Sequence, residues 1–216
     1  MVELARRFGV SQSVIREALT RLGEQGLVVA SPQRGFRVHP LSVADIAGLT
    51  ESRAEIESVA LRLAIERGDI EWETGVVAAY HALEHTPIVN DRQVVDEGWA
   101  ARHSEFHRAL IAGCNNLRLQ EVVRALRDSA ELYRRWYWSF AGDPHCDLVA
   151  EHRTLKDLTL ARDAEAAIEA LTYHINIAPS QLIAYAHRQG LGDLTAPPSS
   201  DDSLGTGPLG QCRDSL

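Results

Sequence analysis

From residue 42 to residue 188 the sequence consists almost entirely of helix-length segments, so a bundle of helices is the expected fold of this region. Most of the short breaks between segments contain glycine, proline, asparagine or aspartate, which favour turns over helix interiors. Pro179 should kink or shorten the last segment. Short connections make successive helices antiparallel, and the sequence predicts a mostly α protein with an all-helical antiparallel bundle. The expected helices cover residues 42–67, 70–85, 91–114, 117–139, 147–161 and 164–188.

Residues 1–40 follow a different pattern. A short first helix is expected to end at Gly9, and Ser11 is a favourable N-cap for a second helix. Two strand-like runs separated by a turn come next, and helix, turn, helix and hairpin in this order are typical of a winged helix-turn-helix. The pattern predicts helices at residues 2–8 and 11–24 and strands at residues 27–30 and 36–38.

Charge is divided unevenly between these two regions, which we call the head (residues 1–40) and the body (residues 41–189). The net charge of the chain is −8, yet the head carries six arginines against three glutamates, a net of +3, and the remainder carries about −11. Attraction to phosphate follows such local excesses of positive charge. We therefore expect only the head to contact nucleic acid; the alternative is a head that serves for protein contact alone.

The second helix of a helix-turn-helix enters the major groove with its N-terminal residues toward the base edges. Glutamine pairs well with adenine there, and arginine with guanine or a phosphate. The turn of the hairpin would lie near phosphates or the minor groove. The predicted DNA-binding residues are Ser11, Gln12, Ser13 and Arg16 on the second helix, and Arg34 and Gly35 at the turn.

Composition excludes several classes of protein. Hydrophobic residues make up 45% of the chain and charged residues 24%, which excludes wholesale disorder, and no apolar run is long enough to span a bilayer. The three cysteines, Cys114, Cys146 and Cys212, are unclustered and fit a reduced cytoplasm. Residues 190–216 are rich in glycine, proline, serine and aspartate and are expected to form a disordered tail.

Four histidines of the body are predicted to face its interior. His103 and His107 are four residues apart on one helix and share a face with the apolar residues Trp99, Phe106 and Leu110. The apolar neighbours of His152 and His174 likewise place these side chains inward on two later helices. A single buried histidine is usually a hydrogen-bonded core residue. Four that converge without carboxylate partners favour a metal ion that takes their lone pairs, and the residues alone leave both readings open.

Arg53 lies on the inward, apolar face of the helix at residues 42–67, where a guanidinium needs an anionic partner. That partner is either the carboxylate of a bound effector or, in a salt bridge, an internal glutamate or the head. Tyr133 and Arg134 are weaker candidates for effector contact, because aromatic residues at helical spacing are more often core.

Three runs of the head, LARRFGVS (4–11), IREAL (15–19) and PQRGFRV (32–38), resemble the winged helix of GntR-family bacterial transcription regulators. The body is similar to the FCD effector domain of the FadR subfamily. The resemblance implies a homodimer that binds palindromic operator DNA and responds to a small metabolite. It also implies that the helix-turn-helix is incomplete, since the family's first helix normally precedes the position of Leu4. Gln12 and Val14 depart from the family's usual arginine and proline.

The same resemblance implies a metal site. FCD domains that bind metal carry an Asp-x-x-x-His pair on one helix and one histidine on each of two later helices. His107, His152 and His174 match these histidines, whereas His103 stands where the family typically has aspartate. An all-imidazole set of His103, His107, His152 and His174 suits Zn²⁺, or Ni²⁺, better than Mn²⁺ or Mg²⁺.

The sequence therefore favours a metabolite-responsive transcription regulator that binds a divalent metal and a small carboxylate. One alternative is a metal-dependent enzyme. It is disfavoured because Glu105, between His103 and His107, is rotated away from their face and no other motif supplies a nucleophile or a base. The other alternative is a truncated, DNA-silent paralogue that only dimerises with a full-length partner.

Overall fold

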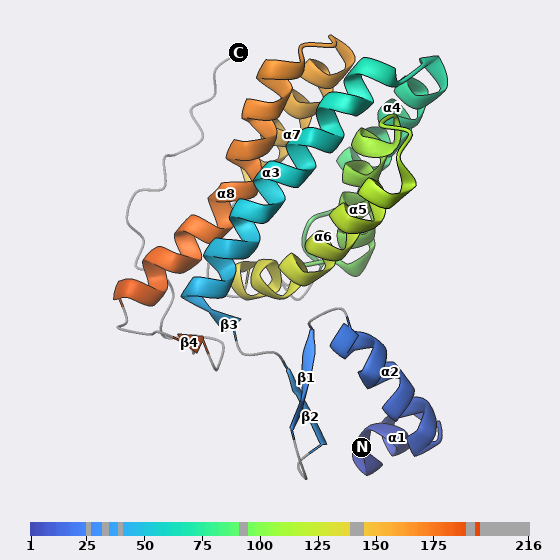
Figure 1. The fold of residues 1–216 in the computed structure, drawn as a ribbon, viewed down its shortest axis with the longest axis vertical. Helices are drawn as coiled ribbons and strands as arrows, with labels where there is room; N and C mark the ends of the chain where they lie inside the picture. Colours follow the sequence, from blue (N-terminus) through green and yellow to red (C-terminus); the bar gives the residue numbers. More distant parts are fainter. Residues whose placement is uncertain are drawn as a thin grey trace.

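The computed structural model describes residues 1–24, 27–31, 35–38, 41–90, 95–138, 145–188 and 193–194. Its elements form a small N-terminal head and a larger helical body (Figure 1). None of the described helices combines the length and the apolar character that a membrane span requires. The expected fold class, a winged helix-turn-helix followed by an all-helical bundle, is confirmed.

The head contains the four predicted elements. Gly9 ends the first helix in the left-handed conformation, with φ 65°, and the Ser11 side chain accepts a hydrogen bond from the backbone N–H of Val14 at 3.4 Å. The two strands form an antiparallel hairpin in which Val28 lies opposite Val38. Its turn, residues 32–34, lies outside the described residues. The elements are α1 (Val2–Phe8), α2 (Gln12–Glu24), β1 (Val28–Ser31) and β2 (Gly35–Val38).

The apolar stripe of α2 is only partly covered. Ile15 is buried and Leu19 and Leu22 are half-buried, but Val14 and Ala18 are exposed. The head therefore has a small core, which consists of Ile15 and, on α1, Ala5.

The described part of the body contains six helices, and side-chain caps explain where several of them begin. Ser42 caps the first through the N–H of Asp45, and Asp69 caps the second through the N–H of Trp72. Asp96 accepts hydrogen bonds from the N–H groups of Gly98 and Trp99. The helices are α3 (Val43–Arg67), α4 (Ile70–Glu84), α5 (Glu97–Ala112), α6 (Leu117–Trp138), α7 (His145–Leu160) and α8 (Ala164–Arg188).

Two details of the predicted helices need correction. The helix expected at residues 91–114 begins only at Glu97, because Asp96 caps it there and Val95 pairs with Val89 in an isolated bridge. Of the two expected effects of Pro179, a kink or a shortened helix, the shortening is wrong, because α8 continues to Arg188 with the proline inside it.

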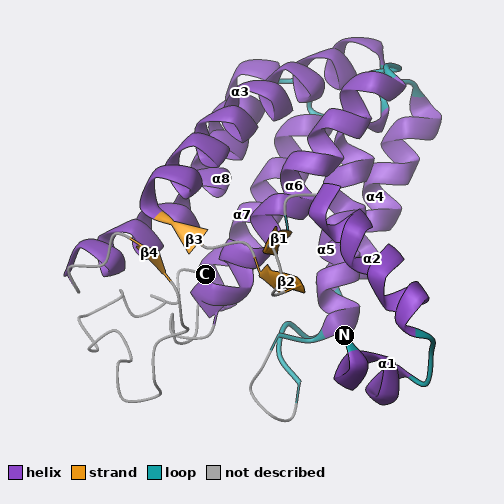
Figure 2. Ribbon diagram, turned by 60° about the horizontal axis from the view of Figure 1, so that its bottom comes forward, coloured by secondary structure: helices purple, strands orange, loops and turns teal. Residues whose placement is uncertain are grey.

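A short pair of strands corrects the expectation that residues 190–216 are disordered throughout. β3 (Leu41–Ser42) pairs antiparallel with β4 (Asp193–Leu194), so a segment beyond α8 returns to the start of α3. Figure 2 shows this pair beside the ends of α3 and α8. The other residues of the expected tail lie outside the described residues.

The core of the body is built around α3, which lies along α8 and α6 (Figure 1). The larger apolar cluster joins α3, α4, α5, α7 and α8, and includes Leu61, Trp72, Phe106, Leu110, Leu155 and Leu171. A second cluster near the start of α3 contains Ile46, Tyr133, Tyr137, Leu182, Tyr185 and Ala186. Both clusters leave polar side chains between the helices, and these form the candidate site.

Trp72 joins the helices at one end of the body. Its ring lies against Gly68 and Gly113, where an added Cβ would come within 2.0 and 2.8 Å of ring atoms, and its Nε1 donates a hydrogen bond to the Ala109 carbonyl at 2.9 Å. A side chain at either glycine would displace the indole from a close-packed position.

We expect Gly113→Ala to destabilise the body by about 1–3 kcal/mol, because the new methyl group overpacks the indole. Gly75→Ala is the matched control, since Gly75 is an exposed position of helix α4 with no atom near its missing Cβ. That change should raise the free energy of unfolding by up to about 1 kcal/mol. Urea unfolding followed by circular dichroism measures both effects, and equal effects of the two substitutions would contradict the packing argument.

Candidate metal centre

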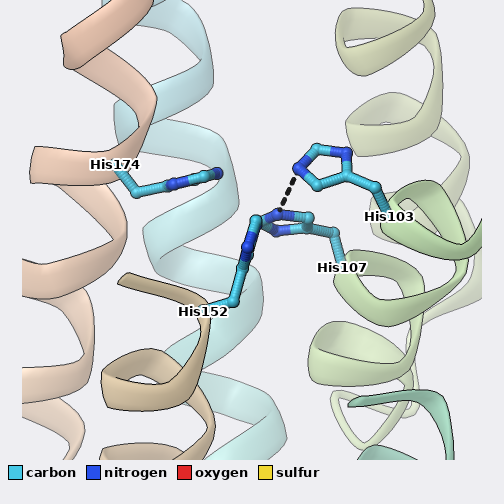
Figure 3. Close-up of side chains that lie close together, drawn as sticks. All are labelled: His103, His107, His152 and His174. Atoms are coloured by element: carbon cyan, nitrogen blue, oxygen red, sulfur yellow. Dashed lines mark hydrogen bonds between the residues drawn. The ribbon is translucent and has the colours of Figure 1, made fainter. Parts of the chain in front are cut away.

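Four imidazole rings meet inside the body. His103 and His107 extend from α5, His152 from α7 and His174 from α8, and Figure 3 shows the rings turned toward one another. Their candidate ligand atoms all lie within 4.8 Å of one another. Ring centroids are 4.6 Å apart for His103 and His107 and 4.8 Å apart for His152 and His174. The structure thus brings together the four histidines that the sequence placed on inward faces.

Helical spacing explains this convergence. On α5, the buried residues Trp99, His103, Phe106 and Leu110 form one stripe, as the sequence predicts. The Trp99 ring stacks on the ring of His103 at a centroid distance of 4.8 Å. His103, His107 and His152 are 2–3% exposed, so water does not solvate their nitrogens.

Two of the rings have a hydrogen-bond acceptor outside the cluster. The Nδ1 of His174 lies 2.7 Å from a carboxylate oxygen of Glu151. The His152 ring hydrogen-bonds to the backbone of Leu148, while its Nε2 is buried without a partner. An Nδ1–H that is donated to a carboxylate or a carbonyl leaves the Nε2 lone pair free, which is how metal-bound histidines are usually oriented.

Burial keeps all four rings neutral at physiological pH. It lowers the pKa of His103, His107 and His152 well below the usual value, and nearby cationic arginines lower it further. Burial and the charge of Arg127 lower the pKa of His174 to about 3. A neutral imidazole is the form that binds metal.

These features fit a divalent cation. The partnerless Nε2 of His152 is a desolvated lone pair, and a cation would compensate it. The Glu151 carboxylate behind His174 is the type of outer partner that orients a metal ligand. The four nitrogen donors match the preferences of zinc and nickel rather than those of magnesium or manganese.

A buried network of charges adjoins the histidines. Glu57 accepts hydrogen bonds from Arg53 at 2.7 Å and from Arg127 at 2.8 Å. Burial raises the pKa of the Glu57 carboxyl, but these two arginines hold that pKa below its usual value. Arg134 lies 2.8 Å from Nδ1 of His103 and is paired with Glu131. Burial lowers the pKa of Arg134 to about 10, which leaves it a cation at neutral pH.

The three predicted effector-binding residues have different surroundings. Arg134 is brought to the histidines. Arg53 has the internal glutamate that the sequence left open as an alternative partner. The Tyr133 hydroxyl donates to Asp45, at the start of α3, and its ring belongs to the second apolar cluster.

Sequence reasoning missed two parts of this site. Arg127 carried no signal, because its importance depends on the packing of α6 against α3. Glu57 and Glu151 carried a weak one, since Glu57 lies one helical turn after Arg53 and Glu151 precedes His152.

A cavity of about 400 Å³ lies beside the cluster, and His152 is the cluster histidine that lines it. It lies among α4, the segment after it, α5 and α7, and its inner wall includes Trp99 and His152. The other lining residues are Tyr80, Leu83, Glu84, His85, Thr86, Pro87, Ile88 and Val149. A small molecule in this cavity would therefore lie against the ring of His152, one of the four imidazoles.

A second group of potential ligands, His81, Glu84 and His85, is exposed on and just after α4. The sequence assigned His81 and His85 to the surface, and their exposure confirms this.

In the head, the predicted DNA-binding residues of α2 are accessible. Ser11, Gln12, Ser13 and Arg16 are all exposed at the start of the helix. Gly35 follows the turn of the hairpin with a positive φ of 85°. Arg34 lies outside the described residues.

Comparison with known sequence families identifies both regions. The profile of the FCD domain matches residues 48–177, and the profile of bacterial regulatory proteins of the gntR family matches residues 1–38. This chain belongs to the GntR family of bacterial transcription regulators. Its GntR-type DNA-binding head followed by an FCD body is consistent with the FadR-like subfamily.

Several curated regulators resemble this GntR-family chain over most of its length. The HTH-type transcriptional regulator BphR of Paraburkholderia xenovorans is 36% identical, with 80% of this chain and 71% of that protein covered. The HTH-type transcriptional repressor GlaR of Escherichia coli is 31% identical, with 85% and 84% covered.

Solved structures show the same fold. A GntR-family regulator from Pseudomonas syringae is 29% identical and aligns with a TM-score of 0.56, covering 87% of this chain and 76% of that one. The E. coli protein McbR/YncC aligns with a TM-score of 0.67 at 21% identity, covering 87% and 85%.

The buried imidazoles of this GntR-family regulator should make its metal-free stability depend on pH. Unfolded histidines titrate near pH 6.5, whereas burial lowers the pKa of the folded ones, to about 3 for His174. Below about pH 6.5 the unfolded state therefore binds protons first, and the free energy of unfolding falls as pH falls, by up to about 1.4 kcal/mol per pH unit for each histidine.

Urea midpoints of chelator-treated protein between about pH 7.5 and pH 5.5 measure this slope. His152→Leu should make the slope shallower by one proton, while His187→Gln, which alters an exposed histidine, should leave it unchanged. A midpoint that does not change across this range would show that the rings do not stay buried and neutral.

Proposed function

We propose that this GntR-family regulator binds operator DNA as a homodimer through its heads and senses a small carboxylate through a divalent metal, zinc or nickel, held in the body. The convergence of four buried, neutral imidazoles, one of which has a partnerless Nε2, is the observation that carries this proposal. A bound metal ion would accept these lone pairs, and its positive charge would attract and hold an anion.

The charges around the cluster favour an anionic effector. The hydrogen-bonded groups nearest the histidines are three arginines and three glutamates, so their charges balance: Arg53, Arg127, Arg134, Glu57, Glu131 and Glu151. Neutral imidazoles add no negative charge, and a divalent ion would leave two positive charges uncompensated in a buried site. A small carboxylate that enters through the 400 Å³ cavity would reduce this excess.

Helix α3 connects the effector site to the head. Arg53 and Glu57 lie on α3, and α3 begins directly after β3, which follows the head. The Tyr133 hydroxyl of α6 contacts Asp45 in the first turn of α3. A ligand that shifts α3 or α6 would change the placement of the two heads of a dimer, and with it their fit to half-sites one DNA turn apart.

An enzymatic function is the second candidate, and the site disfavours it. Glu105, between the two histidines of α5, points away and pairs with Arg108 at 2.7 Å. Glu151 contacts a ring nitrogen of His174. Neither carboxylate occupies the position of a general base beside an activated water.

The metal part of the proposal predicts one zinc ion per chain. Adding zinc to chelator-treated protein should raise the melting temperature, and about a hundredfold excess over the dissociation constant adds about 2.7 kcal/mol of stability. His107→Gln should abolish the shift. The double variant His81→Ala, His85→Ala is the control for the exposed histidines of α4 and should retain it. If only the control variant lost the rise in melting temperature, the zinc site would be at the exposed histidines of α4 and not in the buried cluster.

The DNA part predicts a two-fold symmetric binding sequence, which can be selected from a random duplex library. Gln12→Ala should relax the preference at one base pair of each half-site, at about 1–3 kcal/mol, and Arg16→Ala should weaken binding. Arg118→Ala is the charge-matched control on the body, because its side chain is 93% exposed there. Selection that enriches no sequence, or equal losses for Arg16→Ala and Arg118→Ala, would contradict DNA reading by α2.

A further inference from the structure

The four imidazoles do not have equivalent surroundings, and His103 is the exception. His174 has a carboxylate at Nδ1, and His152 bonds to a backbone group while its Nε2 has no partner. His103 instead has the Arg134 guanidinium at Nδ1, with Nη1 at 2.8 Å. A guanidinium has five N–H donors and no acceptor.

This difference decides which nitrogen of His103 carries the proton. Arg134 can only donate, so Nδ1 of His103 must accept and must have its lone pair free for that bond. A neutral imidazole has one N–H, which in His103 is therefore at Nε2. The Nε2 of His107 lies 3.2 Å away and is the acceptor for it (Figure 3).

The surroundings of His103 hold it in this orientation. The Trp99 ring stacks on it with an interplanar angle of 22°. Arg134 is itself fixed, since its other terminal nitrogen pairs with Glu131 one helical turn away on α6. Turning Nδ1 of the ring toward the cluster would break the bond to Arg134.

We propose that His103 is a hydrogen-bond donor of the effector site and not a metal ligand. The ion would be held by His107, His152 and His174. When the lone pair of His107 is used for the ion, the Nε2–H of His103 loses its acceptor, and an oxygen of an anion bound beside the ion takes its place. This inference rests on the proposed metal site and revises the assignment of His103 as a fourth ligand.

The role has two consequences that a fourth ligand would not have. The His103 proton should persist after metal loading, because the ring does not bind the ion. An anion should also bind more tightly with His103 than without it, because a buried N–H that has lost its acceptor is costly to leave unpaired. Arg134 is the positioning residue, since it determines which nitrogen of His103 donates.

Long-range ¹H–¹⁵N correlation spectra of the ¹⁵N-labelled full-length protein test the tautomer directly. The His103 signals are assigned by their loss in His103→Gln. With zinc bound, we expect the Nε2 resonances of His107, His152 and His174 to shift to metal-bound positions while His103 keeps its proton on Nε2. A metal-bound shift at Nε2 of His103, with loss of its proton, overturns the inference but leaves the metal site intact. An absence of zinc binding overturns both.

Variants give a second measurement, with zinc alone and then acetate as the probes. His103→Ala should keep stoichiometric zinc binding, which His107→Ala should lose, and should bind acetate about tenfold more weakly in the zinc-loaded protein. Arg134→Gln places an amide oxygen that can accept from Nδ1, so in this variant His103 should take the other tautomer and its Nε2 should shift on zinc addition. Loss of zinc binding in His103→Ala, or unchanged acetate affinity there, would overturn the inference.

Discussion

Desolvation of imidazole nitrogens is the constraint around which the body is organised. Four rings from three helices are buried together. Each ring nitrogen must therefore make a hydrogen bond or bind a metal, because a desolvated lone pair without a partner costs free energy. The protein supplies Glu151, a backbone group of α7 and Arg134 for three of the outer nitrogens. The remaining ring nitrogens face one another in the middle of the cluster. The apolar side chains around them offer no hydrogen-bond partners for these nitrogens.

The buried arginines connect this centre to the rest of the body. Arg134 of α6 contacts His103, and Glu57 of α3 ties Arg127 of α6 to Arg53. A buried ion pair adds little net stability, but removing one partner leaves an unpaired charge, so such networks restrict how helices can slide. In the proposed function, a change in charge at the histidines would act on the contact between α3, which begins directly after β3, and α6.

Periodicity was enough to predict most helix boundaries and the inward faces of α5, α7 and α8, because these depend on local spacing. It did not predict what the polar side chains contact. The sequence leaves the partner of Arg53 open, although Glu57 lies one helical turn away on the same helix. It gives no signal for Arg127, because the contact of Arg127 with Glu57 depends on how α6 packs against α3. The return of Asp193–Leu194 to Leu41–Ser42 was missed for the same reason, because two residues far along the chain give no local signal of pairing.

The chemical character of the site follows from which polar groups face inward. A hydrolytic metal site needs a carboxylate or another base poised beside the ion's open position. In the described part of this body, the carboxylate between the paired histidines of α5 is tied to the outer face by Arg108, and the inner carboxylates are held by arginines or by an imidazole. The inward groups that remain are imidazole nitrogens, one of them a partnerless lone pair, and the N–H groups of Arg134. In the proposed function these groups would hold a cation and an anion beside it, which suits a receptor better than a hydrolase.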